Sequence, residues 1–177
     1  RMQEEGLVEK TSGHSWVLRP ALIDEDAYQE SARFRLLIEP SVFAEPGFAI
    51  ASKALDDLLA AQTALADGGA MAEPLQMLFD ADAAFHNRLA EASGNRFLAQ
   101  AIRQITKLRR HAEPERYASR ERLAASFREH AEVLRALTQG DRELAARLMS
   151  EHICHAHASR PDIRKVRVLA HRRLTRR

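Results

Sequence analysis

The sequence predicts an all-α protein, an antiparallel bundle of six to seven helices preceded by a β-hairpin. Ala and Leu, which favour helices, dominate the composition. The seven Gly and six Pro are few, and they cluster at the breaks between long periodic runs. Each run has an apolar stripe and the breaks are short, a combination that is typical of antiparallel bundles.

The first twenty residues differ from the rest of the chain. Residues 7–10 and 15–18 alternate in polarity on either side of a short polar break, which predicts a β-hairpin. Residues 1–6 look like the last turn of a helix that ends at a glycine. Because the chain begins at Arg1, in the middle of such a pattern, we expect it to be part of a longer protein.

The remaining elements are helices, each bounded by a start or stop signal. Pro40 divides the first run, and Asp67-Gly68-Gly69 stops the second. Gln139-Gly140-Asp141 is a helix stop followed by an N-cap residue. The predicted helices span residues 24–39, 48–66, 73–93, 95–111, 119–138 and 141–160, and a short basic helix finishes the chain.

The composition indicates one globular domain of ordinary size. With 177 residues, 45% of them apolar and 29% charged, the chain can bury a core large enough to fold alone. It has no stretch of 18 apolar residues and no signal-peptide pattern, so we expect a soluble, cytoplasmic protein with no membrane partner. The single cysteine, Cys154, agrees with a reducing compartment.

The net charge of +2 hides an uneven distribution. Residues 161–177 carry seven Arg or Lys and one acid, a charge of +6, so the rest of the chain carries −4. We expect this basic tail to dock against the acidic body, with contact to DNA phosphates as the alternative. Arg109 and Arg110 are expected on a solvated helix face, with nucleic acid or a neighbouring domain as their alternative partners.

Four residues on three of the predicted helices form the strongest chemical pattern. Asp82 and His86 lie four positions apart and therefore on one helix face. His130 lies about ten residues before the turn at Gly140, and His152 lies about eleven after it. At 1.5 Å per residue both histidines are roughly 15 Å from that turn, so an antiparallel pair places them at one height. Three imidazoles and one carboxylate can therefore converge inside the bundle.

This donor set is that of a divalent metal site with room for an exogenous ligand. Zn²⁺ is the first expectation, with Ni²⁺, Co²⁺ and Mn²⁺ as alternatives. His155 follows His152 by three positions and is either an outer partner or an alternative ligand, whereas Asp80 and His157 are out of phase with the set. The remaining histidines are taken as ordinary residues: His14, His111 and His171.

Other catalytic patterns are missing from the sequence. It contains no G-x-S-x-G, Walker or Rossmann glycine pattern. The adjacent pairs Glu129-His130 and Glu151-His152 differ from the Glu-x-x-His motif of di-iron bundles. We therefore expect no enzyme. An open site of three histidines and one aspartate leaves two rivals, a metalloenzyme that activates water or O₂ and a direct sensor of the metal.

Several stretches of the chain match one known family. They are Phe-Arg-Leu-Leu-Ile-Glu-Pro at 34–40, Asp-Ala-Ala-Phe-His at 82–86, Ala-Ser-Gly-Asn at 92–95, Glu-His-Ala-Glu-Val-Leu-Arg-Ala-Leu at 129–137, Gly-Asp at 140–141 and Glu-His-Ile at 151–153. With them, residues 24–160 resemble the effector-binding domain of the FadR-type (FCD) branch of the GntR transcription regulators. Residues 1–18 resemble the end of that family's winged-helix domain, although the usual wing Gly-x-Gly is reduced to Gly13-His14-Ser15.

The resemblance implies a division of the chain and a set of partners. Residues 1–20 would be the wing end of a DNA-binding domain, and residues 21–177 the effector-binding bundle. In this family the four residues Asp82, His86, His130 and His152 would bind a metal whose coordination is completed by a small organic-acid effector.

The resemblance further implies a homodimer that binds operator DNA and represses or activates transcription in response to the effector. Arg1, Lys10 and His14 are then the candidates for contact with DNA.

Arg35 is the candidate for holding the effector. It lies in a largely apolar stretch between Phe34 and Leu36, where an arginine needs a partner. That partner is either a carboxylate of the effector or Glu39, four positions on along the same helix, and the sequence favours neither.

Overall fold

The computed structural model describes residues 8–10, 16–18, 25–112 and 119–157. Strands β1 (Val8–Lys10) and β2 (Trp16–Leu18) pair antiparallel, with Val8 opposite Leu18 and Lys10 opposite Trp16. The residues that join the two strands lie outside the described ranges, as do Arg1 and His14. The assignment of this segment to a winged-helix domain therefore stays a prediction.

From residue 25 onward the described secondary-structure elements are all helices, which confirms the all-α class. The helices are α1 (Glu25–Ile38), α2 (Ser52–Ala64), α3 (Ala70–Ala72), α4 (Leu75–Ala92), α5 (Arg96–Ala112), α6 (Arg120–Thr138) and α7 (Arg142–Ala156), with a 3₁₀ segment η1 (Pro40–Ala44) after α1 and a π-helical segment η2 (Leu65–Gly69) after α2. Residues 113–118 and 158–177, which include the basic tail, lie outside the described ranges.

The breaks between helices follow the predicted signals. Pro40 begins η1 and so divides the first run, as a residue without a backbone N–H does. Gly68 has a φ of 132° and Gly140 a φ of 76°, backbone conformations that glycine adopts without a Cβ penalty. Asp141 caps α7 by accepting a hydrogen bond from the backbone N–H of Leu144 at 2.8 Å.

The second helix begins later than the sequence predicted. Residues 48–51 run as an irregular segment, and α2 starts at Ser52 instead of residue 48. The backbone N–H of Ala49 donates to the carbonyl of Ala92 at 2.8 Å, and the Phe48 ring packs against Phe43 with centroids 5.4 Å apart. These tertiary contacts, which the local sequence does not encode, replace the first helical turn.

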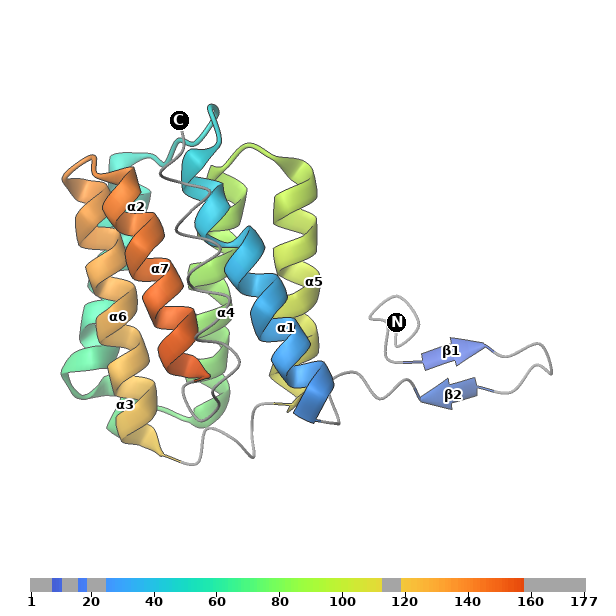
Figure 1. Cartoon of the computed structure of the whole chain (residues 1–177). Helices are drawn as coiled ribbons and strands as arrows, with labels where there is room; N and C mark the ends of the chain where they lie inside the picture. Colours follow the sequence, from blue (N-terminus) through green and yellow to red (C-terminus); the bar gives the residue numbers. More distant parts are fainter. Residues whose placement is uncertain (1–7, 11–15, 19–24, 113–118, 158–177) are drawn as a thin grey trace.

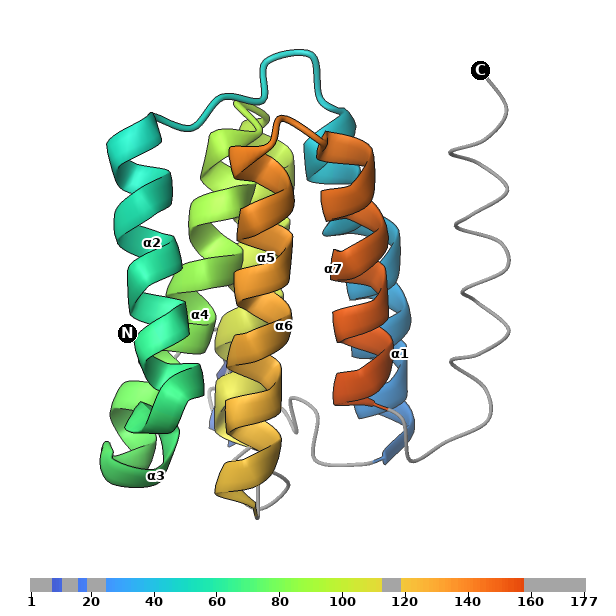
Figure 2. The same cartoon turned by 90° about the vertical axis from the view of Figure 1, so that its left-hand side faces the viewer.

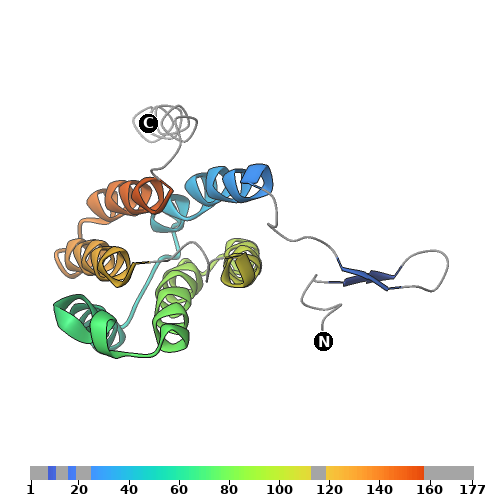
Figure 3. The same ribbon diagram turned by 90° about the horizontal axis from the view of Figure 1, so that it is seen from below.

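The long helices run roughly along one axis, which is clearest in the end-on view of Figure 3. Helix α6 packs against α2 and α7, and α1 packs against α5 and α7 (Figures 1 and 2). Helix α4 packs mainly against α5 and also contacts α6. The three helices that carry the predicted metal ligands, α4, α6 and α7, therefore meet in the interior of the bundle.

The apolar core surrounds this meeting point. Its largest fully buried side chains come from α1, α4, α5, α6 and α7, and they include Leu36, Phe85, Leu89, Ile102, Leu134, Met149 and Ile153. A smaller cluster with Leu78, Leu123 and Phe127 lies where α3 packs on α6. No helix among the described residues combines the length and the apolar character that a membrane span requires.

Candidate metal centre

The structure brings Asp82, His86, His130 and His152 together in the bundle interior. One ligand atom from each of the four lies within 4.8 Å of the others. The three histidines are buried, and the Asp82 side chain is 16% exposed. Such a cluster of three imidazoles and one carboxylate can bind a divalent metal ion.

Two local features of the chain produce this convergence. Asp82 and His86 share a face of α4, with the Asp82 carboxylate 3.9 Å from His86 Nε2. The short turn at Gly140 folds α7 back along α6, and it places His130 Nε2 3.1 Å from His152 Nε2. The Asp82 carboxylate completes the cluster at 3.7 Å from His130 Nε2.

Each imidazole of the cluster has its Nδ1 atom held by an acceptor. His86 Nδ1 lies 2.7 Å from a carboxylate oxygen of Glu39, and His152 Nδ1 lies 2.8 Å from Glu129. His130 Nδ1 lies 2.8 Å from the side-chain oxygen of Gln62. An acceptor on Nδ1 places the proton of a neutral imidazole there and leaves the Nε2 lone pair for a ligand.

The pair of facing nitrogens of His130 and His152 is an arrangement that a cation could stabilise. With both Nδ1 atoms protonated, His130 and His152 turn Nε2 lone pairs toward each other at 3.1 Å. That contact is repulsive unless an extra proton or a cation lies between the two atoms. Burial first, and then the charges of His152 and His86, hold the pKa of His130 well below its ordinary value.

Burial also lowers the pKa of His152, although Glu129 opposes this shift. The extra proton is therefore disfavoured on both rings, whereas a divalent cation would satisfy both lone pairs.

Aromatic rings hold the imidazoles in place. Phe85, which is fully buried, stacks on His130 with centroids 3.8 Å apart and an interplanar angle of 12°. The same ring meets His86 edge-on at 4.9 Å, and Phe127 meets His130 edge-on at 5.9 Å. These contacts restrict ring rotation and keep water from the apolar side of the cluster.

Arg35 is buried beside the cluster and pairs with Glu39. Its guanidinium donates to both carboxylate oxygens of Glu39, and its Nη2 lies 3.0 Å from His86 Nε2. Burial alone would raise the pKa of Glu39, but the charges of Arg35 and His86 and their hydrogen bonds hold it far below its usual value. Of the two partners that the sequence left open for Arg35, the structure shows Glu39, and contact with an effector stays a prediction.

A small cavity of about 10 Å³ adjoins the cluster. It is lined by Arg35, Asp82, His86, Thr106 and Arg109, and it has room for about one water molecule. The hydroxyl of Thr106 is buried and has no hydrogen-bond partner among the described residues. Two arginines and two of the candidate metal ligands therefore line one cavity.

The prediction of a solvated Arg109 is wrong. This side chain is 2% exposed, and it donates to the Tyr28 hydroxyl at 3.1 Å and to Ser31 Oγ at 3.3 Å. Its guanidinium also lies over the Tyr28 ring, 4.7 Å from the centroid. The sequence marked Arg109 only as one of two adjacent arginines on α5, and the packing of α1 on α5 buries it.

The other candidate residues lie outside the cluster. His155 Nδ1 lies 2.9 Å from Glu129, and its side chain is 53% exposed, so it belongs to the outer surroundings of His152. His157 is buried against Tyr28 with ring centroids 5.0 Å apart, and Asp80 is exposed. The side chains of the three remaining histidines lie outside the described residues.

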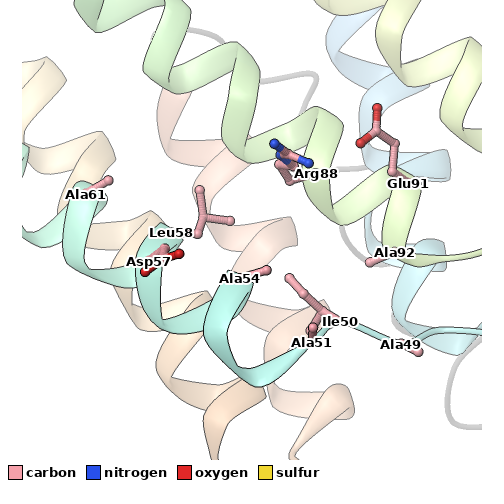
Figure 4. A pocket seen from close by; sticks show the side chains of 10 residues that line it. All are labelled: Ala49, Ile50, Ala51, Ala54, Asp57, Leu58, Ala61, Arg88, Glu91 and Ala92. Atoms are coloured by element: carbon pink, nitrogen blue, oxygen red, sulfur yellow. The ribbon is translucent and has the colours of Figure 1, made fainter.

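A larger hollow of about 460 Å³ lies between α2 and α4, away from the cluster (Figure 4). Its floor is rich in alanine, and Arg88 and Glu91 of α4 stand across from Asp57 of α2. Both carboxylates are paired, Asp57 with Lys53 at 2.8 Å and Glu91 with Arg103 at 3.0 Å. This hollow offers no donor set comparable to that of the histidine cluster.

Three residues of the site were not predicted from the sequence: Glu39, Gln62 and Glu129. The sequence indicates Glu39 only as a possible partner of Arg35, and Glu129 only as the neighbour of His130. One signal for Gln62 does exist, because it follows Leu55, Leu58 and Leu59 on the inner face of α2 as a polar residue in an apolar stripe.

Comparison with known proteins places this bundle in a family. Residues 30–155 match the family described as the FCD domain. One solved structure, from work stating that Lar controls the expression of the Listeria monocytogenes agr system and mediates virulence, is similar at a TM-score of 0.70 and 18% identity, over 90% of this chain and 76% of that one. This similarity concerns the fold, and no curated protein matches the chain. Because the FCD match spans most of the 177 residues, the chain belongs to the FCD-domain family, as its motifs predicted.

Proposed function

We propose that this protein is a ligand-responsive transcription regulator of the GntR type, whose bundle binds a divalent metal ion and a small carboxylate effector. The observation that carries the proposal is the convergence of three imidazole nitrogens and the Asp82 carboxylate within 4.8 Å. Membership of the FCD family supports the regulatory role, as does the structural similarity to Lar, which is reported to control gene expression.

The donor set favours a borderline metal ion. Three neutral imidazoles and one carboxylate suit Zn²⁺, with Ni²⁺, Co²⁺ and Mn²⁺ as alternatives, and are a poor match for Mg²⁺ or Ca²⁺. A bound ion supplies positive charge and a coordination position that a carboxylate oxygen can take. The Nδ1 acceptors keep protons off all three Nε2 atoms, and on His86 Nε2 a bound ion would replace the contact with Arg35 Nη2 at 3.0 Å.

The cavity beside the cluster supports an anionic effector. Arg35 and Arg109 line it together with Asp82 and His86, so a carboxylate entering there meets two guanidinium groups. At about 10 Å³ the cavity is too small for an organic acid, so binding must separate the elements that line it, α1, α4 and α5. This movement is a means by which the effector can favour one arrangement of the bundle over another, which regulation requires.

DNA binding is assigned to the N-terminal part. We propose that residues 1–20 end a winged-helix domain, in which Arg1, Lys10 and His14 contact DNA, and that residues 21–177 form the effector-binding domain of a homodimer. A two-fold symmetric dimer matches operators with two half-sites about one helical turn apart.

The proposal is tested by metal analysis followed by a ligand screen. The purified protein should carry about one divalent ion per chain, and a chelator should lower its melting temperature. Organic acids should then raise the melting temperature of the metal-loaded protein and not that of the chelated protein. A chain without stoichiometric metal under every loading condition would falsify the proposed site.

Two further measurements separate the rival functions. If the metal alone changes the affinity of the full gene product for its promoter DNA, with no effect of any organic acid, the protein is a metal sensor. Turnover of simple carboxylates or esters by the loaded protein would identify a metalloenzyme.

A further inference from the structure

We propose that Gln62 is a positioning residue of the metal centre, which holds His130 in the one tautomer that can serve as a ligand. The inference rests on the proposed metal site and extends it to α2, a helix that supplies no ligand. Gln62 is 1% exposed, and its side-chain oxygen lies 2.8 Å from His130 Nδ1. Among the described residues, this is the only hydrogen bond between α2 and an imidazole of the cluster.

The orientation of the Gln62 amide follows from its second contact. The amide nitrogen donates to the backbone carbonyl of Ala81 at 3.5 Å, and a carbonyl can only accept. The amide oxygen therefore faces His130, and an oxygen there requires that His130 Nδ1 carry the proton. Gln62 in this way ties His130 of α6 to the residue that precedes Asp82 on α4.

The alternative tautomer of His130, with its proton on Nε2, would prevent His130 and His152 from binding a metal ion. Glu129 holds the proton of His152 on Nδ1 and leaves His152 Nε2 as an acceptor, 3.1 Å from His130 Nε2. A proton on His130 Nε2 would therefore donate to His152 and engage two of the four ligand atoms in one hydrogen bond. Among the contacts of the His130 ring, the one that opposes this arrangement is the Gln62 oxygen.

The stacked rings do not decide the tautomer. Phe85 and Phe127 restrict the orientation of the His130 ring, but an aromatic contact does not distinguish which nitrogen carries the proton. The effects of Gln62 and of packing can therefore be separated experimentally, because only the first acts on the proton.

The test uses three variants of the whole chain. Gln62→Met removes the acceptor at similar volume, and Gln62→Glu keeps an oxygen in its place. Gln29→Met is the matched control, since Gln29 is a buried glutamine of α1, 6% exposed, outside the cluster. Zn²⁺ affinity is measured by competition with a chelator, and the proton positions on the histidines of the chelated protein are read from ¹⁵N chemical shifts at neutral pH.

We expect Gln62→Met to bind Zn²⁺ roughly 10- to 100-fold more weakly than the parent. Gln62→Glu should restore the affinity to within a few fold, and Gln29→Met should leave it unchanged. In the chelated parent the proton of His130 should lie on Nδ1, and in Gln62→Met it should move to Nε2.

Two results overturn the inference. One is a Gln62→Met protein that is folded and binds Zn²⁺ as tightly as the parent. The other is a parent in which His130 carries its proton on Nε2, a measurement that needs no variant and so holds even if Gln62→Met fails to fold. A parent that binds no metal refutes the proposed function instead, and the tautomer still reports whether Gln62 acts on His130.

Discussion

Each buried imidazole of the cluster has one nitrogen committed to an acceptor and the other directed at a shared point. A buried polar group without a partner costs roughly 1–3 kcal/mol, so these hydrogen bonds also contribute to folding. The acceptors differ in charge: Glu39 and Glu129 are carboxylates, whereas Gln62 is a neutral amide. The charge of Glu39 is balanced by Arg35, and that of Glu129 is partly offset by Arg122.

Loss of a proposed ligand should abolish tight metal binding. We expect His130→Ala and Asp82→Asn to bind Zn²⁺ more than about 100-fold more weakly than the parent, a larger loss than an outer residue causes. Asp80→Asn is the matched control, because Asp80 lies on the same helix with its side chain exposed. The measurement is chelator competition, and parent-like affinity in His130→Ala would mean that the site is misassigned.

The two possible roles of Arg35 can be separated with a double variant. Arg35→Met removes the guanidinium from a buried carboxylate, which should cost on the order of 3 kcal/mol of unfolding free energy. Adding Glu39→Gln removes the unbalanced charge and keeps an acceptor for His86, so most of the stability should return.

The affinity of this double variant for the effector then shows whether Arg35 also binds the effector carboxylate. If Arg35 also binds the carboxylate, the double variant should be stable and metal-loaded but should bind the organic acid at least roughly tenfold more weakly, as loss of a charge-assisted pair implies. Isothermal titration of the acid into the loaded protein measures this. Parent-like affinity would show that Arg35 serves Glu39 alone.

Acid should destabilise the chelated protein from about pH 6.5 downward. Burial is the largest cause that holds the pKa values of His130, His152 and His157 below 6.5. The unfolded chain takes up these protons near pH 6.5 while the folded chain does not, so stability is full above that pH and falls below it. Each histidine can contribute up to about 1.4 kcal/mol per pH unit.

Urea unfolding in the presence of a chelator at pH 7.5, 6.5 and 5.5 measures this effect. His157 lies outside the cluster, so His157→Phe should reduce the pH slope without removing it. Equal stability at pH 6.5 and 5.5 would contradict the buried neutral state of these rings.

At the scale of elements, the turn between α6 and α7 sets the height at which His130 and His152 meet. Gly140 takes a φ of 76°, and Asp141 caps α7 through the backbone N–H of Leu144. Helix α2 contributes differently, because it adds one hydrogen bond from Gln62 to a site built from other helices. The α6–α7 turn and helix α2 can therefore each be changed by mutation without replacing a proposed metal ligand.

Weakening this turn should lower stability by a predictable amount. Asp141→Ala should cost about 1 kcal/mol, the usual effect of losing an N-cap side chain, which corresponds to roughly 2–4 °C in Tm at this chain length. Arg147→Ala is the control, since it removes only an exposed ion pair with Glu143 on the same helix. Thermal unfolding followed by circular dichroism checks both, and an unchanged Tm in Asp141→Ala would show that the cap is dispensable.

At the scale of the whole molecule, several apolar side chains remain exposed on the single chain. Phe34 and Leu37 of α1 are 41% and 56% exposed, and Phe97 of α5 is 70% exposed. Apolar area of this kind is available for association between copies of the chain.

The proposed homodimer predicts a mass of twice 19.9 kDa in solution. Light scattering over a range of concentrations measures it, and a value near the monomer mass would contradict the dimer. An effector added at 100 times its Kd should raise the unfolding free energy by about 2.7 kcal/mol. This shift should disappear when a chelator removes the metal.

The sequence by itself determined the features that depend on neighbouring residues. Helix periodicity, Pro40, Gly140 and the Asp141 cap predicted the all-α class and most element ends, and equal spacing from one turn predicted that His130 and His152 would meet. The start of α2 was wrong by four residues, because Phe48 and Ala49 take their contacts from distant segments.

Tertiary structure alone decided which groups surround the ligands. Glu39, Gln62 and Glu129 reach the imidazoles from three separate segments of the chain, and Arg109 is buried because α1 packs on α5. The local sequence pattern predicts which residues share a face of a helix. How each helix is rotated and how closely it packs against its neighbours depends on the whole core, and these two quantities determine which atoms come within hydrogen-bond distance.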